Sequence, residues 1–472
     1  METNNSENTC SSLFDINCSV VDDYRQQVES EPASQLAANA CWKHDPVEVC
    51  VRRDVIGCSQ HVFSHKVETE GKPMTNQRSS GRCWLFAALN VIRLPFCKSL
   101  NIDEFEFSQA YLFFWDKIER CNYFLNRMVQ CCREGESVEG RLMSFLLHDP
   151  TIDGGQWDMT VNLILKYGLV PKKCFPESYS SENSARLNRI LHSKLREYTF
   201  EIKELISQPD TTDENIRALL RRQMQEVFRI VSITLGLPPS QFTWQYYDKS
   251  KVAKEIGPIT PKQFYQDCVK PIFDIDEKVC LVNDPRPSNA YGRPYTVFCL
   301  GNMTDGRPTV YNNQPIETLM KVAEESIKGG EAVWFGCEVG KFFASKYGIQ
   351  DTRAHDYKML LGVDVYLGLC KADRLVYGDS LMTHAMTFTA CQTVEGEVPS
   401  KWRVENSWGE ERGEKGYHVL TSQWFKEFVF EVVVDRKYVP QEVMDVLKLP
   451  VIELPAWDPM GALARNRIDT AL

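Results

Sequence analysis

The sequence predicts an α+β protein in which one site is assembled from two distant parts of the chain. A buried apolar run at 84–92 directly follows a cysteine and has the character of a core helix. Strand-like runs lie at 381–388 and 404–409, about three hundred residues downstream (384 − 83 = 301). The chain between them carries charged helical stretches at 185–200 and 215–235. We therefore expect a helical part, a large helical insertion and a β-rich part.

Composition is that of an ordinary globular protein. The 472 residues are 43% hydrophobic and 25% charged, and the length allows about three domains' worth of structure. The net charge of −10 argues against a broad nucleic-acid-binding surface and leaves only a local basic patch open. No apolar run reaches membrane-spanning length, and the first residues are polar rather than signal-like. We expect no membrane partner.

Cysteine usage points to a reducing compartment. Seventeen cysteines are a high and odd number for a chain with no export signal. None of them forms the Cys-x-x-Cys pairs typical of zinc sites, so free thiols are the better interpretation. His61 and His65 lie on a short alternating run at 61–67, have no matching ligands nearby, and are interpreted as surface residues. We expect a cytoplasmic protein that needs no metal ion or organic cofactor.

A candidate nucleophile stands at the start of the apolar run. Cys83 would lie in the first turn of a helix that Pro95 is expected to end. The positive end of the helix dipole favours the thiolate, which is the form that attacks carbonyl groups. Gln77 precedes Cys83 by six residues across a Ser-Ser-Gly turn, and its amide could donate to an oxyanion together with the Cys83 backbone N–H. Taken alone, Cys83 would be an inert core thiol.

The presence of a candidate base decides whether Cys83 is a nucleophile or an inert core thiol. His384 lies in the run at 381–388, and Asn406 follows it by 22 residues (406 − 384). An Asn that accepts from one ring nitrogen would fix the tautomer of His384 and leave the other nitrogen facing the sulfur. Trp408 is interpreted as a lid that excludes water from this hydrogen bond. Together these residues predict nucleophilic catalysis on a peptide carbonyl.

Two further stretches of the helical part carry local signals. Ser108 is predicted to cap a long helix that runs through Tyr123 with a core-facing aromatic stripe. Gly154 and Gly155 precede an apolar helix at 160–167. Paired glycines let backbone approach backbone, as an extended peptide substrate requires, but a plain helix-start turn fits them equally.

These motifs carry a family resemblance. In this order, Gln77-x5-Cys83-Trp84, His384-Ala385 and Asn406-Ser407-Trp408-Gly409 resemble the motifs of papain-like cysteine peptidases. Secreted members typically carry a disulfide-forming Cys three residues before the nucleophile, where this chain has Ser80. A narrower resemblance, to the bleomycin hydrolase family, extends from about residue 60 to 464. It rests on the stretches at 71–73, 105–109, 153–158, 281–286 and 457–464.

The resemblance implies a two-lobed papain-like fold, with a helical lobe that carries Cys83 and a β-barrel-like lobe that carries His384 and Asn406. It implies a cytosolic thiol aminopeptidase, assembled as a homohexamer, that removes N-terminal residues from peptides and hydrolyses the amide of bleomycin. It favours a substrate-binding role for Gly154, Gly155 and Trp408. It also implies that the C-terminal segment lies in the cleft and meets the α-ammonium of the substrate.

Five segments are expected along the chain. They are an N-terminal arm and lead-in (1–60, with the first 40 or so residues mobile), the helical lobe (61–180), a helical insertion for assembly (181–307), the β lobe (308–440) and a C-terminal tail toward the cleft (441–472). Residues 465–472 continue beyond the end of the resemblance. We expect the enzyme to trim them close to Ala464 or Arg465, because a tail through the cleft would cover Cys83.

Two alternatives stay open. A papain-like endopeptidase would share the four site residues but would have an unobstructed cleft, and its rates on free and N-acetylated peptides would distinguish it. A non-enzymatic scaffold or nucleic-acid-binding ring is the other alternative. The intact set of Gln77, Cys83, His384 and Asn406 argues against it, because a scaffold has no need of all four.

Overall fold

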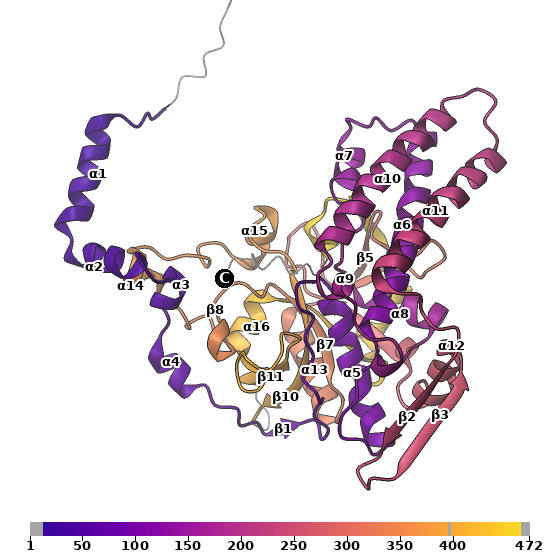
Figure 1. Cartoon of the computed structure of the whole chain (residues 1–472). Coiled ribbons are helices and arrows are strands. Elements are labelled where there is room, and N and C mark those ends of the chain that lie inside the picture. Colours follow the sequence, from indigo (N-terminus) through magenta and orange to yellow (C-terminus); the bar gives the residue numbers. More distant parts are fainter. Residues whose placement is uncertain (1–12, 395–397, 464–472) are drawn as a thin grey trace, which may run out of the picture. The chain divides into compact units, whose positions relative to one another are not determined.

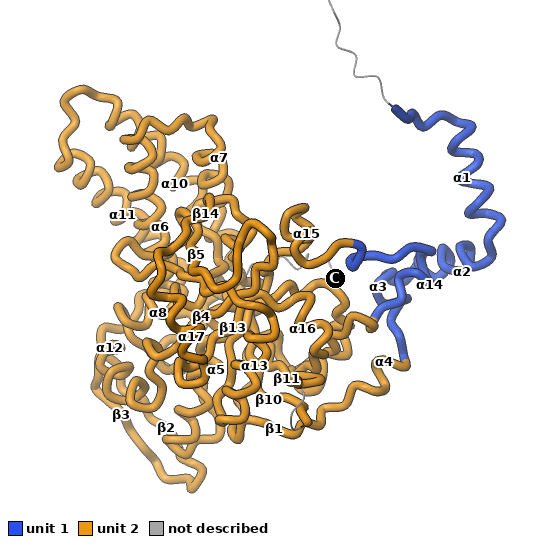
Figure 2. The backbone as a smooth tube through the Cα atoms, turned by 180° about the vertical axis from the view of Figure 1, so that it is seen from behind, with its two compact units in different colours: residues 1–53, 355–368 blue, residues 54–354, 369–472 orange. Residues whose placement is uncertain are grey.

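A computed structural model describes residues 13–394 and 398–463, which fall into two compact units (Figure 2). Unit 1 comprises residues 1–53 and 355–368, and unit 2 comprises residues 54–354 and 369–472. Unit 2 contains the expected helical lobe, helical insertion and β lobe, and the division into five segments stays a prediction. Within the described ranges, no helix combines the length and apolarity needed to cross a membrane.

Unit 1 consists of short helices: α1 (Cys18–Ser30), α2 (Pro32–Cys41), α3 (Pro46–Val49) and α14 (Tyr357–Leu361). The Asn17 side chain caps α1 by accepting from the Val20 N–H at 3.1 Å, and Pro32 occupies the first turn of α2, where its missing N–H costs nothing. α14 packs on α2. The expected mobile arm is thus helical from residue 18 onward, because both helices carry their own start signals.

Unit 2 is organised around a sheet of twelve described strands (Figure 1). Its order is β14-β5-β6-β4-β13-β7-β10-β11-β12-β9-β8, and β1 pairs with β10 outside this path. β2 and β3 form a separate hairpin. The bounds are β1 (His65–Lys66), β2 (Phe242–Tyr247), β3 (Ala253–Ile259), β4 (Lys278–Val282), β5 (Arg293–Val297), β6 (Tyr311–Asn313), β7 (Val333–Cys337), β8 (Phe343–Ala344), β9 (Ile349–Gln350), β10 (His384–Gln392), β11 (Lys401–Glu405), β12 (Tyr417–Thr421), β13 (Val429–Asp435) and β14 (Ile452–Leu454).

The central strands are buried on both faces, which explains their nearly continuous apolar sequences. Every residue of β7 is buried, as is every residue of β10 except its last. β10 pairs antiparallel with β7 on one side and β11 on the other, so that His384 lies opposite Cys337 and Thr387 lies opposite Glu405. His384 is therefore the first residue of a central strand.

The helices of unit 2 supply the rest of the core. They are α4 (Arg53–Cys58, which begins at the unit boundary), α5 (Cys83–Ser99), α6 (Gln109–Arg133), α7 (Arg141–His148), α8 (Trp157–Tyr167), η1 (Lys172–Cys174), α9 (Tyr179–Glu182), α10 (Ala185–Ile206), α11 (Asp213–Leu235), α12 (Pro261–Gln263), η2 (Phe264–Val269), η3 (Ile275–Glu277), α13 (Ile316–Lys328), η4 (Ser345–Tyr347), α15 (Lys371–Val376), α16 (Ser422–Phe428), η5 (Arg436–Tyr438), α17 (Gln441–Asp445), η6 (Val446–Lys448) and η7 (Pro459–Gly461). α5 packs directly on β10 and β7, while α10 and α11 lie beside α6 (Figure 1).

The start of α6 agrees with the expectation from the sequence, whereas the end of α5 does not. Ser108 caps α6 as predicted and accepts from the Tyr111 N–H at 3.0 Å. Pro95 does not end α5, which continues to Ser99. Pro removes only one helical hydrogen bond, and Phe96, just beyond it, packs against Phe105 and Phe107 in the core. Strands β4 and β5, which lie within the expected insertion of 181–307, belong to the main sheet, and the bounds of the insertion stay a prediction.

Candidate active site

Cys83 is the first residue of α5, at the position predicted for the nucleophile. The cap residue Arg82 offers no side-chain cap, although its carbonyl accepts from the N–H groups of Leu85 and Phe86 at 3.0 Å. The dipole of this buried helix therefore directs its positive end at the Cys83 side. Cys83 itself has no measurable exposure.

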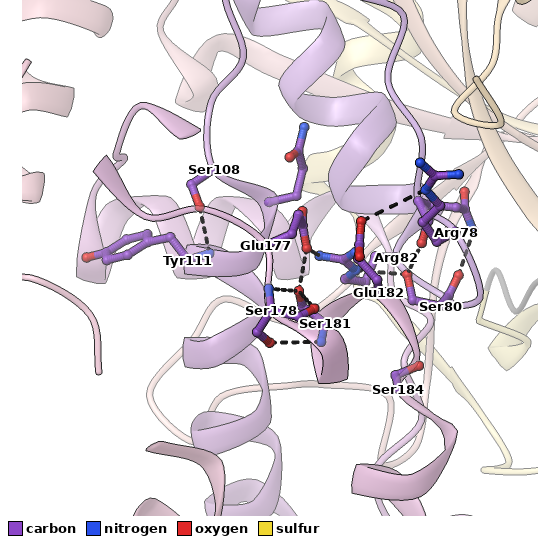
Figure 3. A network of polar contacts seen from close by, with 12 residues as sticks. Arg78, Ser80, Arg82, Ser108, Tyr111, Glu177, Ser178, Ser181, Glu182 and Ser184 are labelled. Carbon is purple, nitrogen blue, oxygen red and sulfur yellow. Dashed lines mark hydrogen bonds and ion pairs between the residues drawn. The ribbon is translucent and has the colours of Figure 1, made fainter. Parts of the chain in front are cut away.

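Arg82 anchors the turn before the nucleophile, as Figure 3 shows. The guanidinium is completely buried, donates to Glu177 at 2.8 Å through one terminal nitrogen, and donates to the Ser80 hydroxyl at 2.8 Å through Nε. Ser181 also donates to Glu177 through its hydroxyl. Breaking a buried ion pair of this kind leaves an uncompensated charge, so the pair holds the turn in one conformation. In the sequence, Arg82 is indistinguishable from a solvated surface charge.

The paired glycines lie beside the nucleophile helix. A Cβ on Gly155 would come within 2.5 Å of the Trp84 ring, and the Trp84 Nε1–H donates to the Asp153 carbonyl at 2.7 Å. Asp153 also accepts from the Gly81 N–H at 3.3 Å and pairs with Lys117 at 2.7 Å. Gly155 thus has a packing reason to be small, and the substrate-binding role of Gly154 and Gly155 stays a prediction.

Gln77 is buried and held at both ends of its amide. Nε2 donates to the Ser80 carbonyl at 2.7 Å, and Oε1 accepts from the Ser407 hydroxyl at 2.6 Å. The reverse assignment would place Oε1 against the Ser80 carbonyl, with two acceptors facing each other. Nε2 carries two hydrogens, so one remains beyond the bond to Ser80 for an oxyanion.

His384 and Asn406 form the predicted pair. His384 Nε2 lies 2.8 Å from Asn406 Oδ1, and the same oxygen accepts from the Ser407 N–H at 2.8 Å. Because Asn406 Oδ1 is held as an acceptor, Nε2 carries the ring hydrogen and Nδ1 is the basic nitrogen. Both residues are buried. Ser407 joins this pair to Gln77, a contact for which the sequence contains no local signal.

Trp408 covers the imidazole of His384. The ring centroids of Trp408 and His384 are 4.8 Å apart with the planes tilted by 32°, and Trp408 is half-buried. This agrees with the expected lid over the bond between His384 and Asn406. The role of Trp408 in binding substrate stays a prediction.

α5 is fixed to the strands that carry His384 and Asn406. Thr387 on β10 donates through its hydroxyl to the Ala87 carbonyl at 3.1 Å. Arg93 on α5 pairs with Glu405, the residue before Asn406, at 2.6 Å, and both side chains are essentially unexposed. The stretch at 71–73 serves this pair, because the Pro73 carbonyl accepts from Arg93 at 2.9 Å.

Burial is the main cause of the pKa shifts of Cys83 and His384. It raises the pKa of Cys83 to about 12, against the backbone N–H groups of Ala385, Trp84 and Cys83, which lower it. It lowers the pKa of His384 to about 4, against the hydrogen bond that the ring donates to Asn406, which raises it. The interaction with Ala385 also places the Cys83 thiol beside the residue that follows His384. Burial therefore favours the neutral form of each group when that group is considered alone.

A cavity of about 880 Å³ adjoins the His384 strand. Its wall includes Met382 and Thr383, which immediately precede His384, and Ala462 and Leu463 at the end of the described chain. The Ala462 carbonyl accepts from Gln156 Nε2 at 3.2 Å. Most of the lining is apolar, as is typical of ligand pockets. The expected trimming near Ala464 and Arg465 falls outside the described residues.

No group of three or more His, Cys, Asp or Glu side chains within the described ranges is arranged to hold a metal ion. The cysteines of the same ranges are all free thiols.

Comparison with known proteins identifies similar chains over nearly the whole length. The model of the Peptidase C1-like family matches residues 15–461. Human bleomycin hydrolase is 54% identical over 441 residues, which cover 93% of this chain and 96% of the human protein. Aminopeptidase C of Listeria monocytogenes is 40% identical over 405 residues, covering 86% of this chain and 89% of the bacterial one. The crystal structure of PepW from Lactobacillus rhamnosis superposes with a TM-score of 0.90 at 39% identity, and the match covers 95% of this chain and 99% of PepW.

Proposed function

The chain belongs to the Peptidase C1-like family, and we propose that it acts as a thiol aminopeptidase that removes N-terminal residues from peptides. The proposal is supported by relatives named bleomycin hydrolase and aminopeptidase C. One structural observation carries it: the first residue of α5 is Cys83, and the strand on which α5 packs begins with a His384 whose ring is oriented by Asn406.

The reaction begins with proton transfer from the Cys83 thiol to Nδ1 of His384. Burial disfavours the thiolate and the imidazolium separately, but the transfer creates both charges together, so their attraction offsets part of the cost. The Cys83 thiolate then attacks the peptide carbonyl. His384 then donates that proton to the leaving amine, and a water activated by the same nitrogen hydrolyses the thioester.

Gln77 stabilises the oxyanion of the tetrahedral intermediates. Its free Nε2 hydrogen and the Cys83 backbone N–H are the donors, and the Ser80 carbonyl and the Ser407 hydroxyl prevent the amide from rotating. Donors that are fixed before the reaction lower the barrier without reorganisation. No step in this sequence requires a cofactor.

The C-terminal segment favours exopeptidase over endopeptidase activity. Ala462 and Leu463 lie in the wall of the cavity that also contains Met382 and Thr383. A chain segment there shortens the cleft on one side, so a substrate is accepted through its amino-terminal end. The amide of bleomycin is a second substrate, which is supported by the names of the relatives at 54% identity. The intact site disfavours a non-enzymatic scaffold.

We also propose a cytosolic homohexamer. The free thiols suit a reducing compartment. α1 and α2 bury no residue, and Leu36 and Trp42 are among their exposed or adjoining apolar side chains. The helical insertion likewise exposes Phe200 and Ile233. Such apolar surfaces are typical of subunit interfaces. Light scattering should give about six times the chain mass of 54.3 kDa, and a monomer at micromolar concentration would contradict the assembly.

Hydrolysis of aminoacyl-coumarin substrates tests the activity. Cys83→Ala should abolish turnover while the fold persists, and Cys370→Ala is the matched control, because Cys370 is an exposed thiol on unit 2. The wild-type enzyme should cleave substrates with a free amino group and spare their N-acetylated forms. Substantial turnover by Cys83→Ala would overturn the mechanism, and preference for acetylated substrates would overturn the aminopeptidase assignment.

A further inference from the structure

Three buried charged side chains hold the C-terminal segment, defined here as residues 452–463. Arg286 donates to both carboxylate oxygens of Asp458, at 2.8 and 3.1 Å. On its other side, Arg286 donates to both oxygens of Asp284, at 2.7 and 2.9 Å. None of the three side chains is more than 9% exposed. We call this group the Asp–Arg–Asp clamp.

The clamp is itself built into the sheet. Asp284 follows β4 by two residues, its N–H donates to Asn313 at 2.8 Å, and its carboxylate accepts from Asn289 at 2.6 Å. Asp458 caps η7 by accepting from the Met460 N–H at 2.9 Å. The guanidinium therefore connects a rigid strand end to the turn at which the segment bends toward the cavity.

The geometry of the clamp fixes the register of the C-terminal segment and adds little to the overall stability of the protein. A buried ion group often adds little stability compared with apolar packing, but loss of one partner is strongly destabilising. The planar fork of Arg286 accepts a carboxylate in one orientation. A slip of one residue would bring Trp457 or Pro459 opposite the guanidinium and leave a buried charge half-paired. The segment therefore has one register only.

That register determines which residues the segment contacts beyond the clamp. Beyond Asp458, the Met460 carbonyl accepts from the Tyr311 hydroxyl at 3.1 Å, and the Ala462 carbonyl accepts from Gln156 at 3.2 Å. Gln156 follows Gly155, the glycine that packs on the Trp84 ring next to Cys83. The clamp thus fixes a path that leads from β4 to the wall of the nucleophile helix.

We propose that Arg286, held between Asp284 and Asp458, is a positioning residue that decides the preference for substrates with a free amino group. It acts by fixing the register of the C-terminal segment against the amino-terminal end of the substrate. The inference rests on the proposed aminopeptidase function. The clamp is anchored by Asn289, Asn313 and the Met460 N–H, so it sets selectivity rather than chemistry.

The chain offers a matched control. Asp351 and Arg353 form the same Asp-x-Arg pair, with donor distances of 2.7 Å to one oxygen and 3.1 Å to the other, but Arg353 is 70% exposed and its pair does not involve the C-terminal segment. Arg353→Lys therefore removes the same fork geometry without changing the segment. Arg286→Lys, Asp458→Ala and Asp458→Asn are the test variants.

The measurement is kcat/KM on aminoacyl-coumarin substrates with free and N-acetylated amino groups. In the test variants, the ratio of free to acetylated rates should fall by about tenfold or more, which corresponds to the loss of one positioned contact. The loss should lie in KM rather than kcat, and the rate of inactivation by iodoacetamide should stay unchanged, because Cys83 and His384 are not altered. Arg353→Lys should keep the wild-type ratio.

The outcomes separate the two proposals. If the wild-type enzyme prefers free amino groups and the folded variants keep its ratio, the clamp inference is overturned and the aminopeptidase function stands. If the wild-type enzyme shows no such preference, the proposed function fails and the inference falls with it. Should Asp458→Ala not fold, Asp458→Asn carries the test, since it preserves the side-chain shape and removes only the charge.

Discussion

Replacement of Asn406 by Asp adds a negative charge beside His384 without changing the orientation of the imidazole ring. The carboxylate can accept from His384 Nε2 and from the Ser407 N–H as the amide oxygen does, at distances of 2.8 Å for each bond. Orientation is therefore retained, and a negative charge is added next to the ring. The charge favours the imidazolium, so the pKa of His384 must rise from its depressed value of about 4.

The structure sets the size of that rise. With charge centres about 4 Å apart and an effective dielectric constant near 20, the attraction is about 4 kcal/mol, or about three pKa units. The new carboxylate is also desolvated, which diverts part of this energy into protonation of Asp itself. We expect a net rise of about one to three units. Neutral His384 is the base, so a higher pKa delays the onset of activity as the pH increases.

The assay is the pH dependence of kcat/KM on a free-amine coumarin substrate. The wild-type acid limb should lie well below pH 6.5, and that of Asn406→Asp should move upward. Asn406→Ala should lose about 10- to 1000-fold in kcat, since a misoriented base sacrifices about 1.4–4 kcal/mol, and its acid limb should not rise. Asn312→Asp controls for burial of a carboxylate elsewhere, because Asn312 is fully buried on β6. An acid limb that stays fixed or moves down in Asn406→Asp would refute the reasoning.

Two further substitutions test the walls of the site. Gly155→Ala places a Cβ 2.5 Å from the buried Trp84 ring, so the free energy of unfolding should fall by about 1–3 kcal/mol, measured by urea denaturation. Gly57→Ala is its control, because its added Cβ meets nothing within 4 Å. Ser407→Ala frees the Gln77 amide to rotate, so kcat should drop by about tenfold or more with little change in KM. An unchanged kcat would show that the amide is held without the hydroxyl.

The α+β, papain-like fold class predicted from the sequence is confirmed by the family match and by the structural likeness to PepW. The prediction succeeded because its signals are local. Cys83 precedes a long apolar run that becomes α5, and Ser108 has the chemistry of a helix cap. His384 begins β10, an apolar run of strand length, and pairs as expected with Asn406, which directly follows β11. Each of these signals is contained within about ten residues.

The failures concern features that depend on tertiary contacts. The sequence predicts that Pro95 ends α5, but α5 continues to Ser99. The packing of Phe96 in the core outweighs the one helical hydrogen bond that Pro95 removes. The sequence suggests an arm at the N-terminus because its composition is like that of a disordered segment. The helices α1 and α2 bury no residue, so no apolar pattern reveals them. Ser407 is adjacent to a recognised motif residue, yet its contact with Gln77 spans 330 positions and leaves no local trace.

Buried charges explain why the site has a single geometry. Arg93 and Glu405 register α5 against β11, and Arg82 with Glu177 fixes the turn that precedes Cys83. In each pair, a shifted register would leave one charge without its partner inside the protein, which costs about 3–5 kcal/mol. That energy is a large fraction of the stability of a typical domain, about 5–15 kcal/mol. A shifted register is therefore strongly disfavoured, and these two ion pairs hold α5 and the turn before Cys83 in one position.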